Sequence, residues 1–144
     1  MALYVEIEKI RFSDQLFFET RTESNVNVDT IKLPPLILQP FIENAIWHGL
    51  SPSKVERKLS ISVRLYSNTH VEIIICDNGI GREKSWENNA KKTYKRESIG
   101  IELTKERLKS FSEYYNNNYY LEFIDHNCFD EGTGTQIVLR LPIL

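Results

Sequence analysis

The sequence predicts a two-layer α/β sandwich, in which helices cover one face of a mixed sheet of about five strands. Segments in which apolar and polar residues alternate, as in half-buried strands, are separated by segments with apolar residues at helical spacing. The 144 residues are enough for one hydrophobic core, and 41% hydrophobic residues are typical of a globular chain. Neither an internal repeat nor a linker divides the sequence, so we expect residues 1–144 to form a single domain.

The composition indicates the cellular compartment of the protein and excludes some classes of partner. The 18 Lys and Arg residues nearly balance the 20 Asp and Glu residues, which gives no overall attraction to nucleic acid or to a membrane surface. Cys76 and Cys128 are too few for a disulfide scaffold and lack zinc-site spacing, which favours a reducing compartment. Because the sequence has no apolar run of bilayer length and no signal-peptide pattern, we expect a cytoplasmic domain.

The N-terminal third is expected to contain a helix, a strand, a loop and a second helix. Residues 1–13 carry apolar side chains at helical spacing without a capping residue before them, which indicates the end of a truncated upstream helix. Alternation predicts a strand over residues 15–23, and the polar residues 24–32 favour a loop. Two prolines introduce a helix over residues 34–48, in which Pro40 implies a kink or a second start.

The rest of the chain is expected to form four strands and a long helix. Clean alternation predicts a half-buried strand over residues 58–66, and consecutive isoleucines predict a deeply buried central strand over residues 70–76. The polar and basic residues 82–97 predict a long loop. Two more strands are expected over residues 119–124 and 135–141. The helix before them is marked by a stripe of Ile101, Thr104, Leu108, Phe111 and Tyr115.

Asn44 and His48 lie one helical turn apart, on the same face of the helix expected over residues 34–48. The carboxamide oxygen of an asparagine is a neutral hard ligand that suits Mg²⁺, which keeps waters and substrate phosphates as its other ligands. Taken alone, a hydrogen-bonded asparagine at a helix end is the better interpretation of Asn44.

A second motif, Asp77-Asn78-Gly79-Ile80-Gly81, directly follows the expected central strand. A carboxylate at a strand end can accept a hydrogen bond from the exocyclic amine of adenine, whereas guanine would present a carbonyl there. Gly79 and Gly81 would let the backbone lie close to a base. An ordinary Asp-Asn-Gly turn explains the same residues.

Two further glycine-containing segments also allow both a ligand-binding role and a purely structural one. Ser98-Ile99-Gly100-Ile101 is expected at a helix start, where free N–H groups favour phosphate, although Ser98 as a plain N-cap is an equal alternative. Gly132-Thr133-Gly134-Thr135 precedes the last strand, where Thr135 either supports a neighbouring carboxylate through water or simply follows a hairpin turn.

The sequence has no P-loop, dinucleotide-binding, zincin or nucleophile-elbow motif, and the order of its motifs resembles the GHKL superfamily of ATP-binding domains. Residues 33–49, LPPLILQPFIENAIWHG, are very similar to the N box of LytS-type sensor histidine kinases in that superfamily. Residues 4–12, YVEIEKIRF, resemble the segment that leads from their dimerisation helices into the catalytic domain. The resemblance covers essentially the whole chain and implies the Bergerat-type (HATPase_c) fold.

The resemblance implies ATP and Mg²⁺ as cofactors, with a role for each motif. Asn44 would hold Mg²⁺ on the phosphates, Asp77 would bind the adenine amine, and Gly100 would lie under the phosphates. The residues that would shape the adenine side are Gly79, Gly81, Gly132, Gly134 and Thr135.

Glu43 and His48 are the candidate catalytic residues that the resemblance implies. Glu43 neighbours Asn44 as in the LytS-type pattern. Trp47 stands where many histidine kinases have a phosphate-contacting lysine, so a cationic contact would come instead from His48 or from one of the basic residues of the expected loop, which are Lys91, Lys92, Lys95 and Arg96. Hydrolytic members of the superfamily keep a base one helical turn before the asparagine, where this chain has Pro40. A kinase, in which the acceptor imidazole is itself the nucleophile, is therefore favoured over an ATPase.

The implied function is that of the catalytic domain of a two-component sensor histidine kinase, which transfers a γ-phosphoryl group to a histidine on upstream dimerisation helices. The sequence given contains no such acceptor, because its first histidine is His48. The implied partners are those helices and a cognate response regulator, and the parent protein is expected to be membrane-anchored with this domain on the cytoplasmic side. Trp47, Ser98 and Leu103 depart from the family pattern, so a degenerate nucleotide-binding or scaffold module is the alternative.

Overall fold

The structure, a computed structural model, describes residues 16–27, 29, 31, 37–46, 56–79, 93–116, 118–124, 129 and 134–143. The helix expected over residues 1–13 lies outside the described residues, as do residues 82–92 of the expected loop. Within the described part of the chain, no helix is long and apolar enough to cross a membrane.

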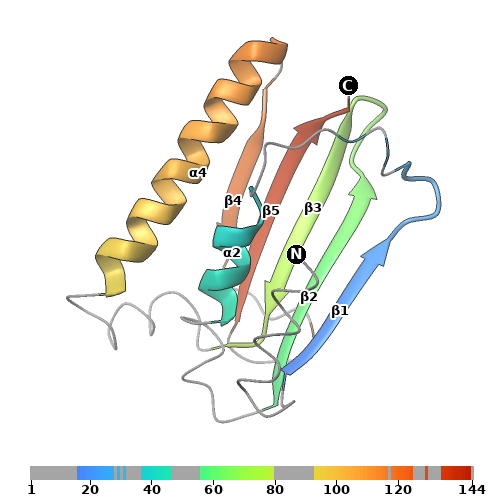
Figure 1. Ribbon diagram of the computed structural model, residues 1–144. Helices are drawn as coiled ribbons and strands as arrows, with labels where there is room; N and C mark the ends of the chain where they lie inside the picture. Colours follow the sequence, from blue (N-terminus) through green and yellow to red (C-terminus); the bar gives the residue numbers. More distant parts are fainter. Residues whose placement is uncertain are drawn as a thin grey trace.

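All five strands expected from the alternation are present and form one mixed sheet. Their bounds are β1 Leu16–Thr22, β2 Arg57–Leu65, β3 His70–Asp77, β4 Tyr120–Ile124 and β5 Thr135–Pro142. The strand order is β1-β2-β3-β5-β4, so the isoleucine-rich β3 is central, as predicted (Figure 1). β1 runs parallel to β2, and every other neighbouring pair is antiparallel.

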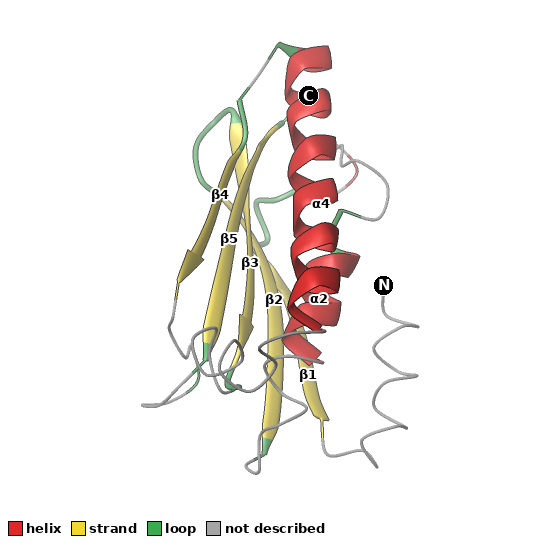
Figure 2. Ribbon diagram, turned by 90° about the vertical axis from the view of Figure 1, so that its left-hand side faces the viewer, coloured by secondary structure: helices red, strands yellow, loops and turns green. Residues whose placement is uncertain are grey.

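Two helices, α2 (Gln39–Asn44) and α4 (Thr93–Tyr115), lie on the same face of the sheet (Figure 2). The predicted two-layer α/β sandwich is therefore confirmed. α2 is shorter than the helix expected over residues 34–48, because residues 37 and 38 are not helical, and Pro40 lies in its first turn, where it marks a helix start and not a kink. Proline is tolerated there because N–H groups of the first turn have no acceptor within the helix.

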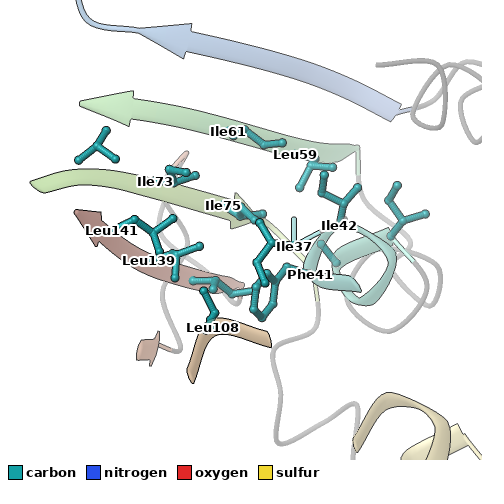
Figure 3. Packing of buried hydrophobic residues seen from close by; sticks show 14 residues of the cluster. Ile37, Phe41, Ile42, Leu59, Ile61, Ile73, Ile75, Leu108, Leu139 and Leu141 are labelled. Carbon is teal, nitrogen blue, oxygen red and sulfur yellow. The ribbon is translucent and has the colours of Figure 1, made fainter. Parts of the chain in front are cut away.

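The hydrophobic core lies between the sheet and the two helices (Figure 3). Ile73 and Ile75 of β3 are each 2% exposed and pack with Phe41 and Ile42 of α2, both 0% exposed. Leu108 of α4 is also 0% exposed and belongs to the same cluster. Burial of each of these large side chains contributes about 2 kcal/mol, so both helices are fixed by their apolar faces.

α4 begins earlier than the sequence predicted. The expected loop extends to residue 97, but residues 93–97 are helical. Lys, Arg and Glu are good helix formers, so a helix can extend toward its N-terminus without an apolar stripe to reveal it. The predicted stripe is confirmed at Thr104 and Leu108, which are 1% and 0% exposed.

The face of the sheet opposite α2 and α4 carries an ion-pair network centred on Glu72 of β3. Glu72 is the direct strand partner of Arg64 on β2 and of Arg140 on β5. Its carboxylate accepts hydrogen bonds from the Arg64 Nε at 2.6 Å and from the Arg140 Nε at 2.7 Å. The Arg140 guanidinium lies over the rings of Tyr66 and Tyr120, 4.0 and 4.5 Å from their centroids. The network therefore ties together the three central strands.

The network lowers the pKa of Glu72. Burial raises the pKa of this carboxyl, but the hydrogen bonds and charges of Arg140 and Arg64 outweigh burial, and the pKa lies below its ordinary value of 4.5. A carboxyl whose pKa is lower in the folded state stabilises that state above its unfolded pKa. The contribution of Glu72 is therefore fully present above pH 4.5 and is lost as the pH falls through the lowered, folded-state pKa.

We expect Glu72→Gln to lower the free energy of unfolding near neutral pH by about 2 kcal/mol, because two guanidinium groups lose their charged partner. Urea unfolding measures the loss, which should shrink as the pH falls below 4.5. Glu106→Gln, on the exposed side of α4, is the matched control and should change the free energy by less than about 0.5 kcal/mol. Equal stability of the two variants at neutral pH would rule out this role for Glu72.

Candidate functional site

Two of the predicted motifs meet at one edge of the sheet, where β3 ends and β5 begins. Asp77, the last residue of β3, is the direct strand partner of Thr135, the first residue of β5. Asp77 is 3% exposed and Thr135 is 8% exposed, and Gly134 is buried beside them. α2 lies over this half of the sheet (Figure 1). The antiparallel register thus brings together residues that are far apart in the sequence.

The carboxylate of Asp77 is held by the turn that follows β3. Its Oδ1 accepts a hydrogen bond from the backbone N–H of Gly79 at 2.9 Å, and Gly79 is also buried. This bond fixes the rotation of the carboxylate. An ionised carboxylate in such a place is a strong acceptor for an amine of a ligand. Of the predicted site residues, those outside the described part of the chain are His48, Gly81 and Gly132.

Asn78 belongs to this edge, although the sequence analysis gave it no role. Its Oδ1 accepts a hydrogen bond from the Lys58 N–H at 2.7 Å, and its Nδ2 donates to the Glu56 carbonyl at 2.7 Å. Its backbone N–H donates to the Lys58 carbonyl at 3.2 Å. We call these three bonds the Asn78 clasp. The turn signal of Asp-Asn-Gly was visible in the sequence, but nothing in it named the partners on β2.

The end of α2 carries Glu43 and Asn44, both half-buried. Gln39, one helical turn earlier, donates a hydrogen bond from its Nε2 to the Glu43 Oε1 at 2.9 Å. This bond orients the Glu43 carboxylate. Both side chains are carried on a helix that the core holds in place.

Asn44 is the site residue whose chemistry suits a metal. Among the described residues, none is hydrogen-bonded to the Asn44 side chain, so the simpler interpretation of a satisfied helix-end asparagine finds no partner there. In the same part of the chain, no three His, Cys, Asp or Glu side chains converge as a metal cage would. Mg²⁺ bound by one carboxamide, waters and phosphates needs no such cage, so Asn44 fits this ion.

Gly100 lies inside α4, not at the helix start that the sequence predicted, because α4 begins at Thr93. A phosphate site made of free N–H groups at a helix N-terminus is therefore wrong for Gly100. The Thr104 Oγ1 donates a hydrogen bond to the Gly100 carbonyl at 2.8 Å. Apart from its chain neighbours and the backbone of its own helix, a Cβ on Gly100 would meet no atom of the described residues within 4 Å. Glycine in a helix interior costs about 1 kcal/mol relative to alanine, so packing does not explain its presence.

Cys76, directly before Asp77, is 1% exposed and is disulfide-bonded. This bond differs from the expectation of a reducing compartment, which rested on the small number of cysteines. Disulfide pairing depends on which segments the fold brings together, and two isolated cysteines carry no signal of that in the sequence.

The chain is similar in sequence to bacterial sensor proteins. It is 33% identical over 138 residues to the putative uncharacterized protein YwpD of Bacillus subtilis, covering 96% of this chain and 46% of YwpD. It is 39% identical over 85 residues to the sensor protein LytS of Oceanobacillus iheyensis, and the match covers 56% of this chain and 13% of LytS. It is 28% identical over 144 residues to the sensor protein kinase HptS of Staphylococcus aureus, and the match covers 97% of this chain and 26% of HptS. The chain thus spans less than half the length of each relative.

Solved structures of histidine kinases share the fold. The histidine kinase domain of a blue-light activated histidine kinase from Erythrobacter litoralis matches with a TM-score of 0.62 at 15% identity, covering 96% of this chain and 57% of that chain. The catalytic domain of the histidine kinase ThkA matches with a TM-score of 0.59 at 12% identity, and the match covers 99% of this chain and 89% of that chain. No family model matches the chain. The chain therefore has the fold of histidine kinase catalytic domains, and it is similar in sequence to a sensor protein and a sensor protein kinase.

Proposed function

We propose that the chain is the ATP- and Mg²⁺-binding catalytic domain of a two-component sensor histidine kinase. The observation that carries the proposal is the buried pair of Asp77 and Thr135 at the edge of a histidine kinase fold, with Asn44 on the helix above that half of the sheet. In the full-length protein, the domain would transfer the γ-phosphoryl group of ATP to a histidine on upstream helices, and a response regulator would receive it. The relatives whose names include sensor protein or sensor kinase support this proposal.

Asp77 would select adenine over guanine. Its carboxylate would accept a hydrogen bond from the exocyclic amine of adenine, and the bond from the Gly79 N–H would keep the carboxylate aimed. Guanine would place a carbonyl oxygen against the carboxylate, and an unpaired buried acceptor costs about 1–3 kcal/mol. Thr135, directly opposite on β5, would support the carboxylate through a water.

The phosphates would lie between the ends of α2 and α4. Asn44 would hold Mg²⁺ through its carboxamide oxygen, and Mg²⁺ would neutralise and orient the phosphates. Gly100 would let a phosphate approach the backbone of α4, since no side chain of the described residues lies within 4 Å of the place its Cβ would occupy, its two chain neighbours apart.

Glu43 would act as a general base toward the acceptor histidine. In the transfer step, a ring nitrogen of that histidine attacks the γ-phosphorus, the bond from phosphorus to the β,γ-bridging oxygen breaks, and ADP leaves. Glu43, oriented by Gln39 and adjacent to Asn44, would take the proton from the other ring nitrogen. His48 would give the phosphates a cationic contact.

Leu103 favours a second candidate, a degenerate nucleotide-binding or scaffold module that transfers no phosphate. It is 50% exposed on α4, where LytS-type proteins often have an asparagine, and a leucine offers a phosphate no hydrogen bond. A separate polypeptide that carries the acceptor helices distinguishes the two candidates. Acid-labile phosphate on that polypeptide supports the kinase, and ATP binding without any transfer supports the module.

We expect Asp77→Asn to lower the affinity for Mg-ADP by about 100-fold, because Gly79 N–H requires the single amide oxygen and the amide NH₂ would then face the adenine amine. Isothermal titration calorimetry measures the loss. Asp29→Asn, at an exposed position, is the control and should bind as the wild type does. Equal binding of ATP and GTP by the wild type would contradict base selection by Asp77.

Asn44→Ala is expected to remove the effect of Mg²⁺ on ATP binding, because the ion loses its protein ligand. The measured quantity is the ratio of ATP affinities with Mg²⁺ and with EDTA, which should fall about tenfold. Asn118→Ala, an exposed asparagine before β4, should leave the ratio unchanged. A ratio that survives Asn44→Ala would place the metal ligand elsewhere.

Gly100→Ala should raise the stability of the domain and weaken its binding of ATP. Alanine in a helix interior raises the free energy of unfolding by about 0.5–1 kcal/mol, and its Cβ meets no protein atom here. The same Cβ would obstruct the phosphates, so we expect about tenfold weaker ATP binding by calorimetry. Ser110→Ala, exposed on the same helix, should leave ATP affinity unchanged. Wild-type affinity in Gly100→Ala would remove Gly100 from the phosphate site.

A further inference from the structure

The Asn78 clasp completes the pairing of β3 with β2 in an unusual way. The last ladder pair of the two strands is Leu59 with Asp77, and the next pair in register would be Lys58 with Asn78. The backbone N–H of Asn78 donates to the Lys58 carbonyl, as in a regular pair. The return bond from the Lys58 N–H is accepted by the side-chain Oδ1 of Asn78 at 2.7 Å. The carboxamide thus replaces the backbone carbonyl of Asn78 in the ladder.

This replacement lets the chain leave the sheet directly after Asp77. In a regular ladder, the carbonyl of Asn78 would have to face β2, and the strand would continue past Asp77. With the side chain in its place, the backbone is released to turn at Gly79, whose N–H then reaches the Asp77 Oδ1 at 2.9 Å. The orientation of the Asp77 carboxylate therefore depends on the Asn78 side chain.

The clasp is also buried, and both polar atoms of its carboxamide have a hydrogen-bond partner. Asn78 is 7% exposed, and its Nδ2 donates to the Glu56 carbonyl at 2.7 Å, one residue before β2 begins. Truncation of Asn78 would leave the Lys58 N–H and the Glu56 carbonyl without these partners. The backbone would then recover the bonds by extending the ladder, which moves Gly79 away from Asp77.

We propose that Asn78 is a positioning residue for base recognition, which aims Asp77 by ending β3 at that residue. The inference rests on the proposed function, in which Asp77 binds the adenine amine. Its consequence is specific, because a misaimed carboxylate loses discrimination between bases, whereas a merely destabilised domain does not. A partly unfolded protein binds every nucleotide more weakly by the same factor, so the ratio of two affinities is independent of the folded fraction.

The test compares ADP with inosine 5′-diphosphate, which has a carbonyl in place of the adenine amine. Calorimetric titration with Mg²⁺ gives both dissociation constants, and their ratio for the wild type is expected to be about 100. Asn78→Ala should lower this ratio at least about fivefold. In Asn78→Asp, the acceptor for Lys58 remains but a carboxylate oxygen faces the Glu56 carbonyl, so the ratio should fall as well.

Two controls separate positioning from stability and from the proposed function. Glu72→Gln, at the other end of β3, lowers stability without touching the turn and should keep the wild-type ratio. Asp77→Asn sets the ratio expected when recognition is lost. If the Asn78 variants keep the wild-type ratio while Asp77→Asn loses it, the positioning role is overturned. If the wild type itself binds neither nucleotide or binds both equally, the proposed function fails, and the role of Asn78 fails with it.

Discussion

The antiparallel pairing of β3 with β5 is the interaction on which the candidate site depends, because its register places Asp77 opposite Thr135. A slip of one residue would turn the Asp77 carboxylate to the other face of the sheet. The same register pairs Glu72 with Arg140, and their hydrogen bond adds to the stability of the sheet. The ion-pair network on the sheet face opposite α2 and α4 therefore stabilises the sheet, and the turn after β3 orients the Asp77 carboxylate.

The hydrophobic core fixes the position of α2, the helix that carries Glu43 and Asn44. α2 is only six residues long, too short to be stable by helix propensity, so its position is set by packing. Phe41 and Ile42 are 0% exposed, and the ring of Phe41 meets that of Phe123 on β4 edge-on, with centroids 6.0 Å apart. These contacts hold Glu43 and Asn44 over the sheet. The apolar residues of α2 thus supply rigidity, and Glu43 and Asn44 are available for a ligand.

The sequence predicted features that rest on local periodicity and missed those that rest on tertiary contacts. The five strands and the buried position of Leu108 follow from alternation and helical spacing. The meeting of Asp77 with Thr135 depends on β5 inserting between β3 and β4, an order that no local pattern encodes and that only the family resemblance implied. The Asn78 clasp was missed because its partner Lys58 lies on another strand. The start of α4 was missed because its first turns have no apolar stripe.

The central claim is that the edge formed by β3 and β5 binds an adenine nucleotide. The most direct measurement is a titration of the ¹⁵N-labelled chain with Mg-ADP, followed by two-dimensional NMR of the backbone amides. The largest shifts are expected at Asp77, Gly79, Gly134 and Thr135, while the amide of Glu72, toward the opposite end of β3, stays nearly unchanged. Shifts centred on the sheet face opposite α2 and α4, or no shifts at millimolar ADP, would contradict the claim.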